Sequence, residues 1–573
     1  MTVASGIAAP LGPRTAWGAV ATSFITAGAG VRLLQYFSQG ELYVDDARLA
    51  LNVAARSLGG LTQPLDHGQA APIPFLWIEK VMTLVGGVNE YALRALPVLA
   101  GIAGLVLLWK VGRRAFGEQP AALATCLGAF STFLIGYGSA VKQYTSDALV
   151  TLLVMWLVID VLRAAYDRAA WWRLAAGGAA ALWISHPAVF VLAGAALALP
   201  ASAAVRAVPT WRRRYAFTTI GWAGMFAVTY FFVYQEGATD TFLRGFWDMT
   251  FLSPGAPDFA GRAMRAVRAM LVPPLVWPGG TLLGTPLVLG GLTTLAFVAG
   301  LVAMFRTRGL SLVLLCAGPY IAVFGAAMLG KYPPVDRLLL FAAPLLFFIY
   351  ASALCWAVGA FPPRARGPAL ATFLVLLTLW RYPPALEQAL HPERRRETKT
   401  LLKAIEAGPP NAPVYLFTPG VSCVCAVWAF YTADWNAPDT ARLRRFADMW
   451  AAGVAATDWS LPDSVRLLRF PDKPVDAAAL SFPLGRRQEL IGVGARIQYA
   501  RGGIARSPAP DAGWVASESD RVQRAANPFA WLWATELYPE NAIAALLHGI
   551  RHRGGRLIFA SRVPGGTVWE VEF

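Results

Sequence analysis

Long apolar runs recur over the first part of the chain and are separated by short polar connections. A helix needs about 20 mainly apolar residues to cross a bilayer, so these runs predict about eleven transmembrane spans. The run 171–204 is interrupted by Ser185-His186-Pro187, where proline ends a helix and predicts a tight hairpin. The predicted spans are 15–37, 91–109, 119–138, 146–162, 171–185, 187–204, 216–234, 280–304, 310–329, 338–359 and 367–381.

The pattern changes after about Arg381, where charged residues and prolines become more frequent. Short strand-like runs then alternate with amphipathic helical stretches, and this alternation predicts a small α/β domain outside the membrane. We therefore divide the chain into a mainly α-helical transmembrane domain, 1–381, and a soluble extracytoplasmic α/β domain, 382–573, in which 440–535 is unassigned. The predicted strands are Val414–Phe417, Leu557–Phe559 and Val568–Phe573, and the helical stretches are Lys399–Glu406 and Glu540–Arg551.

Composition indicates a polytopic membrane protein. Of 573 residues, 56% are hydrophobic and only 15% are charged, whereas a soluble domain carries about 25% charged residues. The net charge of +16 would suggest nucleic-acid binding in a soluble protein, but basic loops explain it here. Every second connection is basic, which places the amino terminus in the cytoplasm and the carboxy terminus outside. The basic loops contain Arg14, Lys110, Arg113, Arg114, Arg163, Arg168, Arg173, Arg206, Arg212, Arg213, Arg214, Arg306, Arg308, Arg364 and Arg366.

Two adjacent acids, Asp45 and Asp46, follow the first span directly. Charged groups beside a membrane span are costly and indicate a functional site by default. Asp45, Arg48, Asn52 and Arg56 are spaced three, four and four apart, which makes one polar stripe on a helix. Such a helix would lie along the membrane surface, although many ordinary interfacial helices carry a similar stripe.

Other polar residues lie in connections that the topology places outside. His67 is a candidate general base or ligand, or else a solvated loop histidine. Lys142 precedes Gln143 and Tyr144 at the mouth of two spans, where it would bind a phosphate or extend to the interface. Asp147 begins the next helix, where an acid suits the helix dipole.

A further cationic segment, Lys331-Tyr332-Pro-Pro-Val-Asp-Arg337, precedes the tenth predicted span. The positive-inside rule disfavours Lys331 and Arg337 on the outer side, so their presence there suggests a specific task. Cations from two loops would neutralise the phosphate of a phosphorylated lipid, while a nearby carboxylate takes a proton from a hydroxyl.

The order of these motifs resembles the GT-C superfamily of integral membrane glycosyltransferases. The match covers roughly residues 15–380, and includes Asp45-Asp46, Lys142-Gln-Tyr-Thr-Ser-Asp147, Ser185-His-Pro-Ala-Val-Phe190 and Lys331-Tyr-Pro-x-x-x-Arg337. The chain looks like the bacterial branch with the lipid A aminoarabinose transferase, and the protein O-mannosyltransferases are more distant relatives.

The resemblance implies an inverting transfer of a sugar from a polyprenyl-monophosphate donor. Asp45 would be the catalytic base, and Asp46 would support it, although family members often carry Asp-Glu here. Lys142 and Arg337 would hold the donor phosphate, with Arg48 and Lys80 as weaker candidates. No metal-ligand cluster is present in the sequence, so no cofactor is required, and a divalent metal is unsupported. The implied substrate-binding residues are Tyr144, Gln143, His67, Tyr332 and Lys331.

The implied location is the bacterial cytoplasmic membrane, and the implied partners are the lipid-linked donor, membrane lipids and an envelope glycan, glycolipid or protein acceptor, without nucleic acid. One alternative is a lipid-linked sugar transporter or flippase, which would favour charges at mid-span and repeats between halves. Another is an envelope assembly protein, which leaves the external Lys-Gln-Tyr and Lys-Tyr-Pro segments without a task. The sequence names neither the sugar nor the acceptor.

Overall fold

The chain forms two compact units in the computed structural model. The membrane unit comprises Met1–Gln39, Ala71–Met82 and Arg94–Pro392, and the C-terminal unit comprises Gly40–Ala70, Thr83–Leu93 and Glu393–Phe573. Residues 40–70 and 83–93 thus group with the C-terminal part, and not with the transmembrane domain expected from the sequence. The structure describes residues 16–38, 40–234, 241–256, 258–272, 286–392, 398–407, 414–417, 421–455, 467–468, 490–494, 497–500, 503–504, 512–526, 529–534, 540–563 and 566–573.

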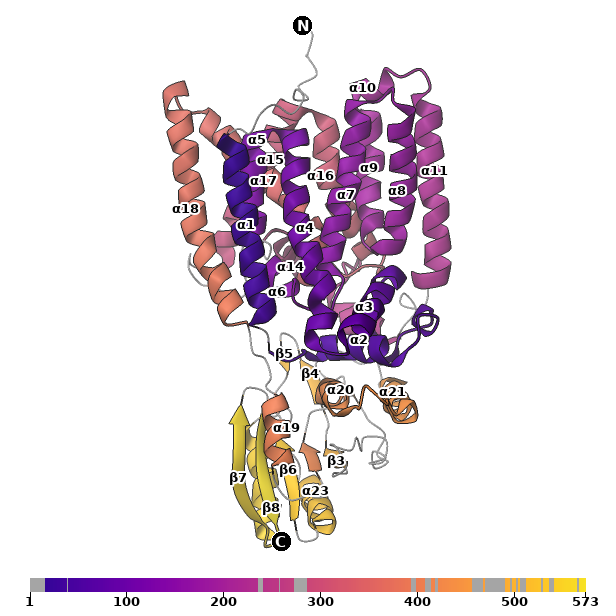
Figure 1. Ribbon diagram of the computed structural model, residues 1–573, viewed down its shortest axis with the longest axis vertical. Helices are drawn as coiled ribbons and strands as arrows, with labels where there is room; N and C mark the ends of the chain where they lie inside the picture. The colour runs from indigo at the N-terminus through magenta and orange to yellow at the C-terminus, as the bar shows by residue number, and fades with distance from the viewer. Residues whose placement is uncertain are drawn as a thin grey trace. The chain divides into compact units, whose positions relative to one another are not determined.

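Long helices that run roughly parallel build the membrane unit (Figure 1). In Figure 1, α7, α8, α9 and α11 stand side by side, and these helices contact one another. The helices are α1 (Ala16–Phe37), α3 (Ile73–Gly86), α4 (Glu90–Phe116), α5 (Glu118–Ala129), α6 (Thr132–Tyr137), α7 (Tyr144–Arg163), α8 (Arg168–Ile184), α9 (Ala188–Ala201), α10 (Ala203–Arg206), α11 (Trp211–Thr229), the π-helical η3 (Tyr230–Tyr234), α13 (Thr241–Trp247), η4 (Asp248–Thr250), α14 (Phe259–Leu271), α15 (Pro286–Arg308), α16 (Leu310–Met328), η5 (Asp336–Ala342), α17 (Ala343–Gly359) and α18 (Pro363–Leu390).

Eight helices within the described ranges are long and apolar enough to cross a membrane. The other three predicted spans correspond to shorter helices, because α5 has 12 residues, α8 has 17 and α9 has 14. As the proline predicted, α8 ends at Ile184 and α9 begins at Ala188. The mainly helical, multi-pass architecture is therefore confirmed, while the expected span 119–138 is broken into α5 and α6.

Two buried arginines lie at that break. The guanidinium of Arg32 donates to the carbonyl oxygens of Gly128 and Ala129, each at 2.9 Å. Arg381 donates to the carbonyl oxygen of Phe130 at 3.1 Å. The last carbonyls of a helix have no partner within it, and water is absent from a bilayer core. The two arginines supply the donors that allow α5 to end inside the unit.

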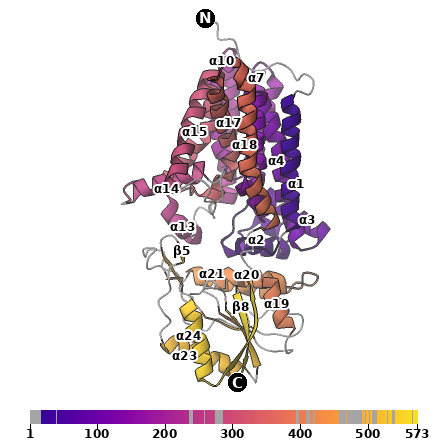
Figure 2. The same cartoon turned by 90° about the vertical axis from the view of Figure 1, so that its left-hand side faces the viewer.

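The α/β part of the C-terminal unit contains a five-stranded sheet with the order β3-β1-β6-β8-β7. β1 pairs in parallel with β3 and β6, whereas β8 is antiparallel to both β6 and β7. α23 and α24 cover one side of this sheet, and α19 lies on the other side (Figure 2). The elements are α19 (Thr398–Glu406), β1 (Val414–Phe417), α20 (Val421–Thr432), α21 (Thr440–Ala455), β2 (Leu467–Leu468), β3 (Leu490–Gly494), β4 (Ile497–Ala500), β5 (Gly503–Ile504), α23 (Ala512–Ala525), β6 (Phe529–Ala534), α24 (Glu540–His552), β7 (Arg556–Val563) and β8 (Gly566–Glu572).

The expected C-terminal sheet is confirmed. The predicted strand Val414–Phe417 matches β1, and the predicted helices match α19 and α24 to within a residue. β6, Phe-Ala-Trp-Leu-Trp-Ala, reads as a continuous apolar run because it lies inside the sheet and is covered on both faces. Much of the unassigned region 440–535 lies outside the described residues.

The C-terminal unit also contains the segment with the two adjacent acids. This segment forms α2 (Val44–Ala55) and the short 3₁₀ helices η1 (Gly60–Thr62) and η2 (Asp66–Gly68). α2 packs against α20, and η2 packs against α21. Helices that are far apart in sequence, α20 and α21, therefore pack against the segment that carries the two adjacent acids.

Candidate functional site

The two adjacent acids occupy the first turn of α2 but differ in exposure. The Asp45 side chain is 27% exposed, and its Oδ1 lies 3.7 Å from Nη1 of Arg48, one helical turn later. Asp46 is buried, at 6% exposed. A carboxylate in the first turn also interacts favourably with the helix dipole. Asp45 is thus the accessible acid of the pair, and Arg48 is its ionic neighbour.

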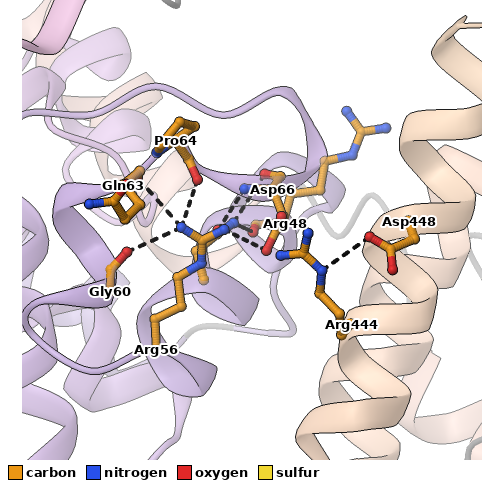
Figure 3. Close-up of polar contacts among 9 residues, drawn as sticks. Arg48, Arg56, Gly60, Gln63, Pro64, Asp66, Arg444 and Asp448 are labelled. Carbon is orange, nitrogen blue, oxygen red and sulfur yellow. Dashed lines mark hydrogen bonds and ion pairs between the residues drawn. The ribbon is translucent and has the colours of Figure 1, made fainter.

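The rest of the polar stripe has a structural task. The amide nitrogen of Asn52 donates to the carbonyl oxygen of Asp66 at 3.1 Å, and its oxygen accepts the Asp66 N–H at 2.8 Å. Arg56 pairs with the Asp66 carboxylate at 2.7 Å and donates to the Pro64 carbonyl oxygen at 2.6 Å (Figure 3). These contacts fold the loop that follows α2 back onto the helix.

α2 therefore does not present one solvated face. Ten of its 12 residues are buried, including Asp46, Arg48 and Asn52. The helix ends at Ala55, and Leu58, which lies beyond it, is exposed. The expected stripe exists, but protein covers most of it and only Asp45 retains appreciable exposure among its first three members.

His67 is a buried residue and not the solvated loop histidine considered above. It adopts φ 64°, in the left-handed region that few non-glycine residues occupy. Its ring lies 4.9 Å from the ring of Phe446 on α21. Burial is the main cause that lowers the pKa of His67 to about 3; the nearby Asp66 carboxylate opposes it, and the cations Arg48 and Arg56 lower the pKa further. His67 is thus held neutral and contributes packing.

In the membrane unit, several predicted residues gather where α7 begins. Lys142 and Gln143 form the turn before the helix, and Tyr144 is its first residue. The Tyr144 ring meets the Tyr137 ring edge-on at 5.2 Å. Tyr332 lies close enough to Tyr144 and Asp147 for electrostatic interaction. The structure therefore brings the Lys142–Asp147 segment and the Lys331–Arg337 segment together, as α7 and η5 also pack against each other.

The second segment positions its residues differently. The Tyr332 hydroxyl donates to the Leu338 carbonyl oxygen at 2.7 Å, and its ring packs on Phe190 at 4.8 Å. The Arg337 guanidinium lies over the Trp247 ring, 5.3 Å from its centroid. Lys331 is exposed. Tyr332 is thus packed against neighbouring residues, whereas the Arg337 side chain, at the start of η5, is positioned by the Trp247 ring.

Sequence reasoning undervalued Asp147. It is 4% exposed and lies near Ser185 at the α8–α9 junction. Ser185 is itself buried, at 1% exposed. The sequence already contained a signal, since Asp147 is followed by an apolar span and Ser185-His186-Pro187 interrupts another. A buried acid at the end of a span indicates function more strongly than a helix dipole does.

Lys80 lies on α3, half-buried, and burial lowers the pKa of its ammonium group. Asp45, Arg48 and His67 belong to the C-terminal unit, whereas Lys80, Lys142, Tyr332 and Arg337 belong to the membrane unit. The meeting of the acid with Lys142 and Arg337 stays a prediction. Over the described ranges, no cluster of three or more His, Cys, Asp or Glu side chains could hold a metal ion.

Comparisons with known proteins identify the fold. Residues 70–234 match the family described as dolichyl-phosphate-mannose-protein mannosyltransferase. The crystal structure of ArnT from Cupriavidus metallidurans bound to undecaprenyl phosphate aligns with a TM-score of 0.50 and 13% identity. That alignment covers 97% of this chain and 98% of that chain. No curated protein sequence matches this chain significantly.

A second solved structure, the archaeal oligosaccharyltransferase AglB from Archaeoglobus fulgidus in complex with an inhibitory peptide and a dolichol-phosphate, aligns with a TM-score of 0.43 and 11% identity. It covers 95% of this chain and 74% of that chain. The likeness to the ArnT structure shows the fold of this chain, and this is the fold that the predicted resemblance implies.

Proposed function

We propose that this chain is an inverting glycosyltransferase that moves a sugar from a polyprenyl-monophosphate donor to a hydroxyl of a cell-envelope acceptor. The observation that carries the proposal is the accessible Asp45 beside Arg48 at the start of a buried helix. The family match over residues 70–234 and the ArnT-like fold support it.

In this reaction Asp45 accepts the proton of the acceptor hydroxyl. The hydroxyl oxygen then forms a bond to the anomeric carbon of the sugar, while the bond from that carbon to the phosphate oxygen breaks. Polyprenyl phosphate leaves with the bonding electrons, and the configuration at the anomeric carbon inverts. A positioned general base typically contributes about 10²–10⁴-fold to the rate. Asp46 is buried beside Asp45, and its proposed role is to support the base by fixing the local backbone and the electrostatic field around it.

Cations assist the leaving group by neutralising its phosphate. Lys142 and Arg337 are proposed for this role, with Arg48 and Lys80 as further candidates. Two observations support the pair: the Lys142–Asp147 and Lys331–Arg337 segments converge near Asp147, and the Arg337 guanidinium is already oriented by Trp247. Tyr144 and Gln143 are proposed to contact substrate, whereas His67 contributes packing.

The multi-pass architecture and the basic connections support an orientation with the amino terminus in the cytoplasm and the reaction on the outer face of a bacterial inner membrane. Arg114 pairs with Asp160 at 2.5 Å, and Arg173 also contacts Asp160 at 3.5 Å. These ion pairs join the basic ends of α4, α7 and α8 on the side assigned to the cytoplasm.

The deciding experiment replaces Asp45 by Asn, which keeps the size and removes the base. Purified protein is incubated with polyprenyl-phosphate-linked sugars extracted from host membranes, and the release of polyprenyl phosphate in the presence of envelope acceptors is measured. We expect Asp45→Asn to lower kcat by at least about 100-fold, in line with loss of a general base.

The matched control is Asp439→Asn. Asp439 accepts the N–H of Arg442 at 2.9 Å as it caps α21, and asparagine caps a helix equally well. This variant should keep wild-type activity. Full activity in Asp45→Asn would refute the assignment of the base, and absence of transfer by the wild-type protein would refute the proposed function.

A further inference from the structure

A polar cluster joins distant parts of the C-terminal unit beside the proposed catalytic helix. The hydroxyl of Tyr431, near the end of α20, accepts the backbone N–H of Leu42 at 2.7 Å and donates to the Glu90 carboxylate at 2.9 Å. Lys399 on α19 pairs with Glu90, and its ammonium lies over the Tyr431 ring, 4.9 Å from the centroid. The backbone N–H of Lys399 donates to the Glu41 carboxylate.

The cluster is more than a surface ion pair. The Glu90 side chain is only 15% exposed, and Tyr431 is half-buried. Burial first, then the charge of Glu90, raise the pKa of the Tyr431 phenol far above its usual value, so the hydroxyl stays protonated and donates. The Lys399 side chain is 46% exposed, so the network is only partly shielded from water. Hydrogen bonds among its less exposed members strengthen one another. α20 itself is anchored by buried Trp428 and Phe430.

The cluster acts on the chain where α2 begins. Leu42 lies three residues before Asp45 and is itself buried, at 1% exposed. The N-cap residue of α2, Tyr43, makes no side-chain capping hydrogen bond, so the usual local device that fixes a helix start is absent from this position. The hydroxyl of Tyr431, which comes from α20, instead holds the backbone immediately before α2 through its hydrogen bond with Leu42.

We propose that Tyr431, oriented by Glu90 and Lys399, is a positioning residue that fixes Asp45 for proton transfer. The inference rests on the proposed function of Asp45, and assigns the C-terminal domain a direct part in that function. A displacement of about 1 Å at a reacting group is enough to reduce a rate by about 100-fold. The hydroxyl of Tyr431 would therefore affect kcat although it touches neither sugar nor phosphate.

The test compares Tyr431→Phe with Thr432→Val in the full-length protein. Phenylalanine preserves the ring and the stacking with Lys399 but removes both hydroxyl hydrogen bonds. Thr432 is adjacent, and among the residues that the structure describes its hydroxyl bonds to the Trp428 carbonyl oxygen of its own helix, at 2.8 Å. We expect kcat of Tyr431→Phe to fall about 10- to 100-fold, with Kd for undecaprenyl phosphate within about twofold of wild type. Thr432→Val should match the wild-type protein.

Two further readouts separate positioning from general destabilisation. Hydrogen exchange of the Leu42–Ala47 amides should accelerate in Tyr431→Phe, while exchange in α23 and α24 stays unchanged. In an Asp45→Asn background, Tyr431→Phe should cause no additional loss of residual transfer, because both changes act on the same step. Independent, multiplicative losses would overturn the inference.

The outcomes are distinguishable from failure of the proposed function. If wild-type protein transfers sugar and Tyr431→Phe keeps wild-type kcat, the positioning role alone is wrong. If wild-type protein releases no polyprenyl phosphate, the proposed function is wrong, and hydrogen exchange at Leu42–Ala47 still tests the structural contact. Unchanged exchange at these amides would overturn the contact itself.

Discussion

Asp45 and Asp46 are identical side chains at adjacent positions, and their surroundings separate them. Asp45 is partly exposed beside Arg48, whereas Asp46 is buried. The spacing of three residues between Asp45 and Arg48 predicted that they share one face of a helix, because residues three apart are neighbours on a helix, and the structure shows them as an ion pair. Burial depends on the elements that pack against α2, which the local pattern does not contain.

His67 illustrates the limit of local reasoning. The sequence left it as a base, a ligand or a solvated residue, yet it is buried against Phe446, which comes from a distant part of the chain. Tyr431 and Lys399 escaped notice for the same reason. Neither belongs to a motif, and their importance arises only where α19 and α20 meet Leu42 and Glu90.

The low pKa of His67 predicts acid sensitivity. The folded-state pKa of about 3 lies below the ordinary value of 6.5, so the unfolded chain binds a proton that the folded chain excludes. Folding stability therefore falls as the pH drops from about 6.5 toward 3, by about 1.4 kcal/mol per pH unit from this group alone. Asparagine tolerates the left-handed backbone and does not titrate, so His67→Asn should flatten this dependence.

Melting temperatures at pH 7.5, 6.5 and 5.5 check this prediction. His548 is exposed on α24, and His548→Asn should retain the wild-type pH dependence. His67→Asn also loses ring packing on Phe446, so its melting temperature at pH 7.5 should be lower than wild type. A slope between pH 7.5 and 5.5 as steep as that of wild type would show that another group controls acid stability.

At the scale of elements, hydropathy located the apolar spans well but could not show where a span is broken into two helices. The segment 119–138 reads as one apolar run. α5 ends inside it because Arg32 and Arg381 donate hydrogen bonds to the carbonyl oxygens at its end. These arginines belong to α1 and α18, so the break is a tertiary effect. The strands and helices of the C-terminal sheet were predictable because their apolar periodicity is local.

Close helix packing makes a second prediction at this scale. α9 and α16 meet at Gly194 and Gly318, where a Cβ on Gly318 would lie 2.7 Å from the Cα of Gly194. Small residues allow membrane helices to approach in this way. Gly318→Ala should therefore destabilise the protein by about 1–3 kcal/mol through overpacking.

Gly325 on the same helix provides the control, because a Cβ there would meet nothing within 4 Å. Gly325→Ala should be neutral or stabilising by about 0.5–1 kcal/mol, since alanine favours the helix over glycine. Thermal unfolding in detergent measures both variants. Equal effects of the two substitutions would contradict the proposed close approach of α9 and α16.

At the scale of the whole molecule, the chain passes repeatedly between its two compact units. It leaves the membrane unit at Gly40, returns at Ala71, leaves again for Thr83–Leu93 and returns at Arg94. Everything from Glu393 onward belongs to the C-terminal unit. The acid-bearing helix α2 thus folds with the C-terminal domain, although it follows the first membrane helix in sequence. Division of the chain by hydropathy places α2 in the transmembrane domain, whereas its contacts group it with the C-terminal unit, because hydropathy does not report contacts between distant segments.

This interleaving predicts that truncation after residue 392 releases α2. Without α20 and α21, the buried faces of α2 and η2 lose their packing partners, so amides in 40–70 should exchange faster by roughly two orders of magnitude. α7 and α17 should keep their protection, because their packing partners α8, α9, α5 and α15 belong to the membrane unit. A full-length protein cleaved at a protease site inserted between residues 392 and 398 is the control, since both pieces are present and 40–70 should stay protected. Wild-type protection of 40–70 in the truncated chain would show that α2 folds without the C-terminal domain.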